Sequence, residues 1–234
     1  MGSSSRTVRR TVGREQARRE WGVEMRWLPD AARDLGAESA LQTAEYAVAG
    51  REHGVVGLGL GGSEHLYPPE LFAAAFARAR AAGLRSYPHA GELAGPPSVW
   101  NALRVLHADR IGHGVRSIED PALVSHLREQ AITLDICPTS NVRLHVYPDY
   151  AAHPLRRLYD AGVPVTINAD DPPLFNTDLT QEYRIAAHVF GFSADELCAL
   201  SLQAVHASFL PEDDKARLVR EFEEEYERLQ RRYL

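Results

Sequence analysis

Short apolar segments alternate with amphipathic helical segments along most of this chain, and that alternation constrains the fold more than any other feature. The apolar segments are rich in β-branched residues, and the segments between them carry apolar residues at helical spacing. Successive apolar segments end about 25–35 residues apart, which is the spacing of βα units that share a parallel sheet. The expected strands are 23–28, 55–60, 84–89, 110–113, 132–137 and 163–169.

Helices are expected between these strands and after the last of them. The segment 68–83 is the clearest, because prolines open it, alanines and apolar residues follow at helical spacing, and Gly83 ends it. Ser193 is expected to cap the first of two helices that follow the last strand. The other expected helices are 97–108, 120–130, 153–162, 193–209 and 212–234.

Nearly every expected strand ends on a glycine or on a side chain capable of chemistry. In an open doubly wound sheet such residues gather near one switch point, whereas in a (β/α)8 barrel the loops after all strands meet on one face. We therefore predict an α/β fold of the (β/α)8 TIM-barrel type with extra carboxyl-terminal helices, of which this chain holds about six of the eight βα units. We expect residues 1–12 to form a disordered leader and residues 13–234 to form the barrel domain.

The composition excludes several classes of partner. The chain of 234 residues has a formal net charge of −6, which argues against nucleic acid or an anionic membrane, since both need a clustered basic surface. No apolar run reaches the length of a membrane span, and the first residues lack the apolar core of a secretory signal. Two cysteines are too few for a disulfide framework. We expect a cytoplasmic protein that acts on a small molecule.

Five titratable residues stand at the ends of the expected strands. His89 and Asp170 suit zinc, because imidazole and carboxylate are common ligands and a site with open coordination makes a bound water acidic. Glu92 suits a general acid, and His113, between two glycines, suits a group that orients or deprotonates an attacking water. Asp171 would face the substrate, since two adjacent carboxylates repel each other unless a cation separates their roles.

Each of these residues also has a structural interpretation. A lone histidine is often a buried residue with satisfied hydrogen bonds, and the pair Asp170 and Asp171, before two prolines, also fits a turn or a helix cap. Titratable groups at three of the expected strand ends together favour the functional interpretation. Cys137 is expected to be a small buried apolar residue. His145 and His153 are expected to cap helices or lie exposed, rather than line the pocket.

The motifs HAGE, RIGHG, CPTSN and TINADDPPLF, followed by TDLTQEY, resemble in this order the adenosine deaminase family of metal-dependent aminohydrolases. The resemblance is dense over residues 55–183. It implies a barrel with one Zn²⁺ per chain that replaces the amino group at C6 of a purine nucleoside by oxygen, as from adenosine to inosine, and releases ammonia. It also implies that His89 and Asp170 bind the zinc.

The resemblance implies roles for four further residues. Glu92 would donate a proton to the ring nitrogen N1, and His113 would position the attacking hydroxide. Asp171 would help to hold the hydroxide and the purine, and the backbone of Gly62 would contact the base. The residues match the strand-end groups, so the resemblance and the spacing point to the same site.

Two departures from the family pattern qualify what the resemblance implies. The family has an H-x-H pair that supplies two more zinc ligands, and no two of the ten histidines here are spaced that way. We therefore expect an amino-terminally truncated member; a catalytically impaired remnant and a half-site completed by self-association through an open barrel edge are alternatives. The motifs GLGLGGSE and HAGELAGPPSVWNAL look more like the bacterial branch that acts on aminodeoxyfutalosine, so that modified adenosine is an alternative substrate.

Overall fold

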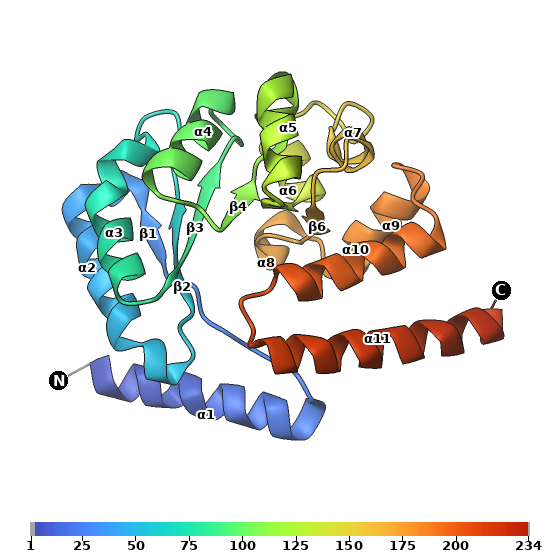
Figure 1. Ribbon diagram of the computed structural model, residues 1–234, viewed down its shortest axis with the longest axis horizontal. Helices are drawn as coiled ribbons and strands as arrows, with labels where there is room; N and C mark the ends of the chain where they lie inside the picture. The colour runs from blue at the N-terminus through green and yellow to red at the C-terminus, as the bar shows by residue number, and fades with distance from the viewer. Residues whose placement is uncertain (1–2, 234) are drawn as a thin grey trace. The chain divides into compact units, whose positions relative to one another are not determined.

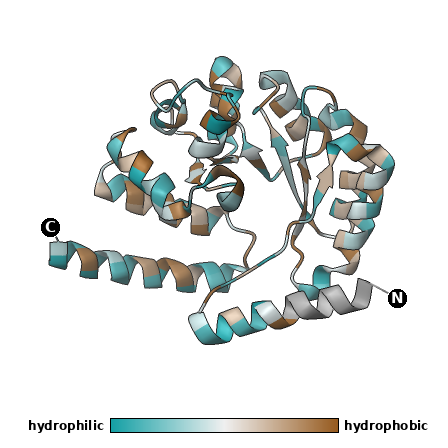
Figure 2. Ribbon diagram, turned by 180° about the vertical axis from the view of Figure 1, so that it is seen from behind, coloured by the Kyte–Doolittle hydropathy of each residue, from teal (hydrophilic) through white to brown (hydrophobic). Residues whose placement is uncertain are grey.

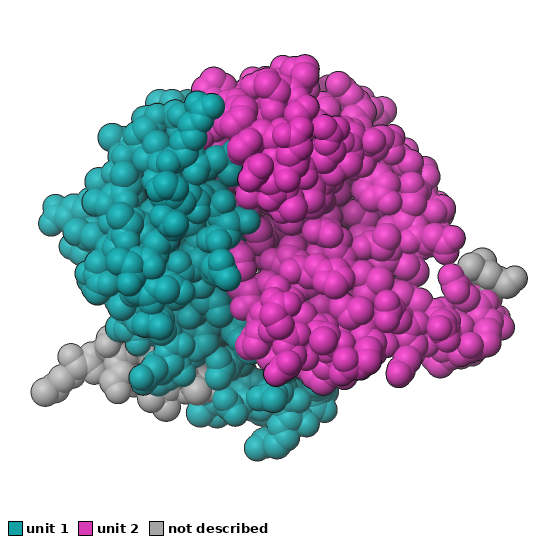
Figure 3. Space-filling view, viewed as in Figure 1, with its two compact units in different colours: residues 1–89, 101–109 teal, residues 90–100, 110–234 magenta. Residues whose placement is uncertain are grey.

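A computed structural model describes residues 3–233 of the chain. The chain divides into two compact units, coloured separately in Figure 3. The first unit comprises the chain up to residue 89 together with 101–109, and the second comprises 90–100 together with the chain from residue 110 onward. None of the helices in the described part of the chain combines the length and the apolarity that crossing a membrane requires.

In the first unit, three strands pair in parallel and follow chain order: β1 (Asp30–Ala32), β2 (Gly57–Gly61) and β3 (Arg85–Ala90). Helices α2 (Gly36–Ala49) and α3 (Ala73–Ala81) contact each other and pack on this sheet (Figure 1). Both helices turn alanines inward, and these small side chains let a helix lie close to its neighbours. The core of the unit includes Ala40, Ala44, Ala47, Leu58, Leu60, Phe72 and Phe76.

In the second unit, β4 (Arg110–His113), β5 (Thr133–Ile136) and β6 (Val165–Ile167) also pair in parallel and in chain order. Every residue of β5 and β6 is buried, as expected for parallel strands covered on both faces. The helices that follow these strands are α5 (Pro121–Glu129), α6 (Pro138–Arg143), α7 (Leu155–Asp160), α8 (Pro172–Phe175), α9 (Leu179–His188), α10 (Ala194–Ala207) and α11 (Glu212–Tyr233).

A buried polar network joins the three strands of the second unit. The Arg110 guanidinium on β4 pairs with the Asp135 carboxylate on β5, and it also donates to the Ala207 carbonyl at 3.0 Å. The Thr166 hydroxyl on β6 donates to the other carboxylate oxygen of Asp135 at 2.5 Å. Because each buried charge has a partner, the network is compatible with burial and holds the strand register on which the site depends.

Five of the six predicted strands are confirmed, but the first is misplaced. Within 23–28, Trp27 forms an isolated parallel bridge with Val55, and the strand itself lies further along the chain at β1. Pro29 separates the two because it has no N–H to donate to a ladder, although its carbonyl accepts from the Gly59 N–H.

The predicted helix starts are confirmed where a capping side chain marks them. The Asp120 carboxylate accepts from two backbone N–H groups at the start of α5. Ser193 opens α10 with a capping box, in which its hydroxyl accepts from the Glu196 N–H and the Glu196 carboxylate accepts from the Ser193 N–H. The predicted helix 97–108 corresponds to α4 (Pro96–Val105).

Several helices of the structure were not predicted. They include α1 (Ser3–Trp21), which begins within the stretch 1–12 that was expected to be a leader. Residues 1–2 of that stretch lie outside the described residues. The last helix, α11, mixes hydrophilic and hydrophobic residues along its length, and none of its described residues is buried (Figure 2). Short 3-10 turns complete the fold at η1 (Arg33–Leu35), η2 (Arg51–His53), η3 (Pro69–Phe72) and η4 (Val115–Glu119).

Candidate active site

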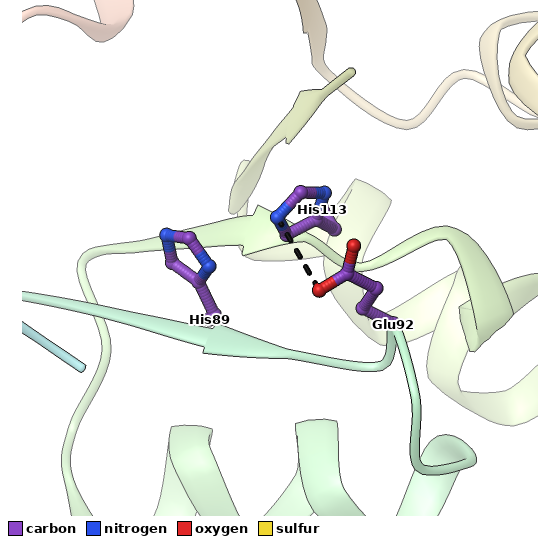
Figure 4. Close-up of side chains that lie close together, drawn as sticks. All are labelled: His89, Glu92 and His113. Carbon is purple, nitrogen blue, oxygen red and sulfur yellow. Dashed lines mark ion pairs between the residues drawn. The ribbon is translucent and has the colours of Figure 1, made fainter. Parts of the chain in front are cut away.

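Three titratable side chains of the second unit meet beyond the carboxyl ends of its strands. His113 is the last residue of β4, and its Nε2 atom lies 3.5 Å from Oε2 of Glu92 and 4.0 Å from Oδ2 of Asp170. Figure 4 shows the ion pair between His113 and Glu92, and it labels His89 on β3. The side chains of His113, Glu92 and Asp170 are 2%, 12% and 21% exposed. Three of the predicted site residues, Glu92, His113 and Asp170, therefore lie close together beyond the carboxyl ends of these strands.

The backbone of this cluster is held in an uncommon conformation. His113 has φ 61° and Asp170 has φ 56°, both in the left-handed region that side chains other than glycine rarely occupy. Each such residue costs on the order of 1–3 kcal/mol, and residues of this kind gather at functional sites. The strain at both residues supports a functional interpretation of the cluster over a simple turn.

Gly114 is required directly after His113. Its φ is +67°, and a Cβ atom there would lie 2.5 Å from Cδ2 of the buried Leu134. Gly114→Ala is expected to lower the free energy of unfolding by about 2–4 kcal/mol, through the left-handed backbone and the overpacked core together. Chemical denaturation measures this loss.

Gly162→Ala is the matched control for Gly114→Ala. Gly162 has φ +79°, but a Cβ there would meet the flexible Arg128 side chain at 3.2 Å. The control should lose about 1–2 kcal/mol, the backbone cost alone. Equal losses in the two variants would contradict the overpacking at Leu134.

Helix α6 carries two side chains that hold the cluster. Ser140 donates its hydroxyl to Oδ2 of Asp170 at 2.7 Å. The Asn141 side chain lies with Nδ2 at 3.3 Å from Oε1 of Glu92 and at 3.3 Å from Nδ1 of His113. Both residues belong to the CPTSN motif and both are buried, so the motif supplies hydrogen-bond partners to three of the predicted site residues.

His153 is buried, and the expectation that it lies exposed is wrong. Its Nδ1 accepts from the Leu155 N–H at 3.2 Å at the start of α7, so the expectation of a capping role is confirmed. Its Nε2 lies 3.1 Å from Oδ1 of Asn141, and its ring packs between Tyr147 and Phe190. Burial lowers the pKa of His153 to about 4, so the ring is neutral near pH 7.

The burial of His153 makes stability depend on pH. The folded protein protonates this ring below about pH 4, whereas an unfolded chain does so near pH 6.5. Between these values the unfolded state binds more protons, so the free energy of unfolding should fall as the pH is lowered, by on the order of 3 kcal/mol for this group. Denaturation of the wild type and of His153→Phe from pH 7 to pH 4 measures it, and parallel pH profiles would contradict the assignment.

Glu182 is a further buried carboxylate that the sequence did not single out. It lies on α9, accepts from the Thr139 N–H at 3.1 Å, and accepts from the Thr177 hydroxyl at 2.5 Å. These bonds connect the first turn of α6 to α9. Because each carboxylate oxygen accepts a hydrogen bond, the cost of burying this group is offset. The TDLTQEY motif contains this residue, but nothing in its spacing marks the partners.

Cys137 is buried, as predicted, and lies beside the cluster. A ring nitrogen of His113, the Sγ atom of Cys137 and a carboxylate oxygen of Asp170 all lie within 4.8 Å of one another. Nitrogen, sulfur and carboxylate oxygen are the donor types that zinc accepts, so this set is chemically compatible with that ion. Burial raises the pKa of the Cys137 thiol well above its usual range, with the Asp170 carboxylate adding to the effect.

Asp171 follows Asp170 and precedes α8. Its carbonyl accepts from the N–H groups of Leu174 and Phe175, but its carboxylate makes no capping bond to the helix. Asp171 is exposed, so the alternative of a side-chain helix cap is not what the structure has. Because Asp171 is exposed, its carboxylate is available to solutes.

The remaining two predicted residues, Gly62 and His89, belong to the first unit. Gly62 directly follows strand β2 and has φ +102°, and the next residue, Ser63, donates its N–H and hydroxyl to Asp34 at 3.0 and 2.5 Å. The hydroxyl bond from Ser63 is the main reason that the pKa of Asp34 is lowered. On β3, the His89 carbonyl accepts from the buried Arg33 guanidinium at 2.7 Å, so both predicted residues lie on anchored backbone.

The sequence model of the adenosine deaminase family matches residues 6–225 of this chain. Adenine deaminase of Sinorhizobium medicae (strain WSM419) is 47% identical over 208 residues, which are 89% of this chain and 64% of that protein. Aminodeoxyfutalosine deaminase of Streptomyces coelicolor is 46% identical over 212 residues, which are 90% of this chain and 55% of that protein. The chain thus spans less than two thirds of the length of these relatives.

Comparison with solved structures supports the fold. The crystal structure of an amidohydrolase from Burkholderia ambifaria, which contains bound zinc, matches with a TM-score of 0.87 and 30% identity. The match covers 93% of this chain and 61% of that one. The parallel strands with their surrounding helices are therefore of the predicted TIM-barrel type. The family match over nearly the whole chain identifies it: this protein belongs to the adenosine deaminase family.

Proposed function

We propose that this chain catalyses the hydrolytic deamination of a 6-aminopurine nucleoside with release of ammonia. The observation that carries the proposal is the cluster of Glu92, His113 and Asp170 at one sheet edge, supported by serine and asparagine side chains from α6. The relatives named as adenine and aminodeoxyfutalosine deaminases support a purine substrate. A structural cluster of carboxylates alone would not need a histidine with a strained backbone at its centre.

The proposed roles follow from the positions of the side chains. Glu92 in its protonated form donates to N1 of the purine, while His113, 3.5 Å from it, contacts the attacking oxygen. Attack of the oxygen at C6 makes a tetrahedral centre and adds charge to the ring, and the proton from Glu92 on N1 neutralises that charge. The bond between C6 and the amino nitrogen then breaks, and the amino group leaves as ammonia with the proton of the attacking oxygen. Asp171 helps to hold the purine, and the Gly62 backbone contacts the base.

Zinc is the proposed cofactor, with His89 and Asp170 as its ligands. Asp170 suits this role because Ser140 already orients one of its oxygens. When bound, a zinc ion with an open coordination position lowers the pKa of a bound water to about 7. Glu92 would then supply the proton to the purine, and His113 would orient the attacking oxygen.

A second candidate substrate is aminodeoxyfutalosine, favoured by the 46% identity to the Streptomyces coelicolor enzyme. Free adenine is a third, favoured by the 47% identity to the Sinorhizobium medicae enzyme. All three substrates share the 6-aminopurine ring, which the proposed residues contact. They differ in what is attached to N9 of that ring, which is the part that decides specificity.

A deamination assay on the full chain tests the proposal. Adenosine, aminodeoxyfutalosine and adenine are each supplied to zinc-supplemented protein, and ammonia release and the loss of purine absorbance are followed. The substrate with the highest kcat/KM identifies the specificity. Absence of turnover with all three would refute the proposed activity for this chain, and stoichiometric bound zinc would exclude the impaired-remnant alternative.

A further inference from the structure

A directed chain of hydrogen bonds begins at the first turn of α7. The Leu155 N–H can only donate, so Nδ1 of His153, at 3.2 Å, is the acceptor and carries no proton. Burial keeps this ring neutral near pH 7, so its single proton is on Nε2. That nitrogen lies 3.1 Å from Oδ1 of Asn141, which can only accept. The helix start thereby decides which way the histidine donates.

The orientation of the Asn141 amide follows. Because Oδ1 accepts from His153, the NH₂ group must face the other side, toward Oε1 of Glu92 and Nδ1 of His113, both at 3.3 Å. An NH₂ group has two hydrogens, one for each of these partners. Asn141 and His113 are both buried, and Glu92 is largely so, which strengthens a bond made in this environment.

We propose that His153 is a positioning residue, which acts through the Asn141 amide to hold His113 in the tautomer with Nδ1 as acceptor and the proton on Nε2. The protonated nitrogen is the one that lies 3.5 Å from Glu92 and 4.0 Å from Asp170. Within the described residues, the His153 ring hydrogen-bonds with the Leu155 N–H and with Asn141, so it acts on the reacting groups through Asn141.

The tautomer of His113 decides whether this residue orients the attacking oxygen or acts as a general base. This consequence rests on the proposed function. A neutral histidine with its proton on Nε2 donates a hydrogen bond toward the reaction centre, whereas a general base needs that nitrogen unprotonated. His113 therefore orients the attacking oxygen and does not remove its proton.

Nitrogen NMR of the isotope-labelled full chain tests the tautomer without any substrate. The His113 resonances, assigned with His113→Gln, should show a protonated Nε2 and an unprotonated Nδ1 in the wild type. In His153→Phe, whose ring can pack between Tyr147 and Phe190, the Asn141 amide is released and the two His113 tautomers should mix. A proton on Nδ1 of His113 in the wild type, or unchanged His113 shifts in His153→Phe, would overturn the proposal.

Kinetics test the consequence for catalysis. His153→Phe should lower kcat by about 10- to 100-fold with little change in KM, because a small misplacement of a reacting group costs that much. His153→Gln should restore most of the activity, since its amide NH₂ can replace the Nε2 donor. His188→Phe, at an exposed histidine on α9, is the control that should leave kcat unchanged.

The two readouts separate this inference from the proposed function. If the wild type deaminates no purine, the proposed function fails, and the NMR result still decides the tautomer. If the wild type is active but His153→Phe retains full kcat, the positioning role is refuted. Equal loss of kcat in His153→Phe and His153→Gln would indicate a packing role and would also refute it.

Discussion

Replacing Glu92 by glutamine is expected to lower kcat for purine deamination by about 10³-fold, within the range that a positioned general acid contributes. Glutamine has nearly the same shape, and its carbonyl oxygen can still accept from Asn141, which lies 3.3 Å from the present carboxylate. What it lacks is an acidic proton for N1 of the purine. KM should change much less than kcat, because the missing interaction is made in the transition state.

Glu129→Gln is the matched control for Glu92→Gln. Its carboxylate is 63% exposed at the end of α5, so the same chemical change there should leave kcat and stability unaltered. Steady-state rates with the best substrate of the three, together with thermal unfolding of each variant, complete the measurement. A Glu92→Gln enzyme with wild-type kcat would rule out Glu92 as the proton donor.

Much of the fold and part of the site were predictable because both depend on periodic patterns. Parallel strands end at a common edge, so residues 57 positions apart in the chain, such as His113 and Asp170, meet without any local sequence relation. The strand β1 was misplaced because it lacks a recognisable strand pattern. It is three residues long and contains two alanines, whereas the more apolar stretch 23–28 ends directly before Pro29.

The residues that support the site were harder to predict. Asn141 belongs to a motif that the sequence marks clearly, but a motif does not say which atoms its side chain will bond. His153 lies in an irregular loop 12 residues further on, where no apolar period marks burial. Its burial depends on Tyr147 and Phe190, one nearby and one from after α9, and that packing exists in the folded chain alone.

Asp170→Asn is expected to weaken zinc binding by about 100-fold or more. Loss of a residue that only hydrogen-bonds to a metal ligand already costs about 10- to 100-fold, so loss of a ligand itself should cost at least as much. The substitution removes the negative charge of a proposed ligand, while Ser140 can still donate to the remaining amide oxygen. Deamination should fall with the metal content. Zinc per chain, measured after equilibration with a chromophoric chelator, gives the affinity directly and needs no substrate.

Asp171→Asn is the control that makes this result specific to the metal. The change in charge is the same at the adjacent residue, but Asp171 is assigned to the substrate, so zinc affinity should be retained while kcat/KM falls. If losing a negative charge anywhere near the metal were enough to weaken zinc binding, both variants would lose affinity to a similar extent. Retention of zinc by Asp170→Asn, or its loss from Asp171→Asn, would show that the two neighbouring carboxylates do not divide the work as proposed.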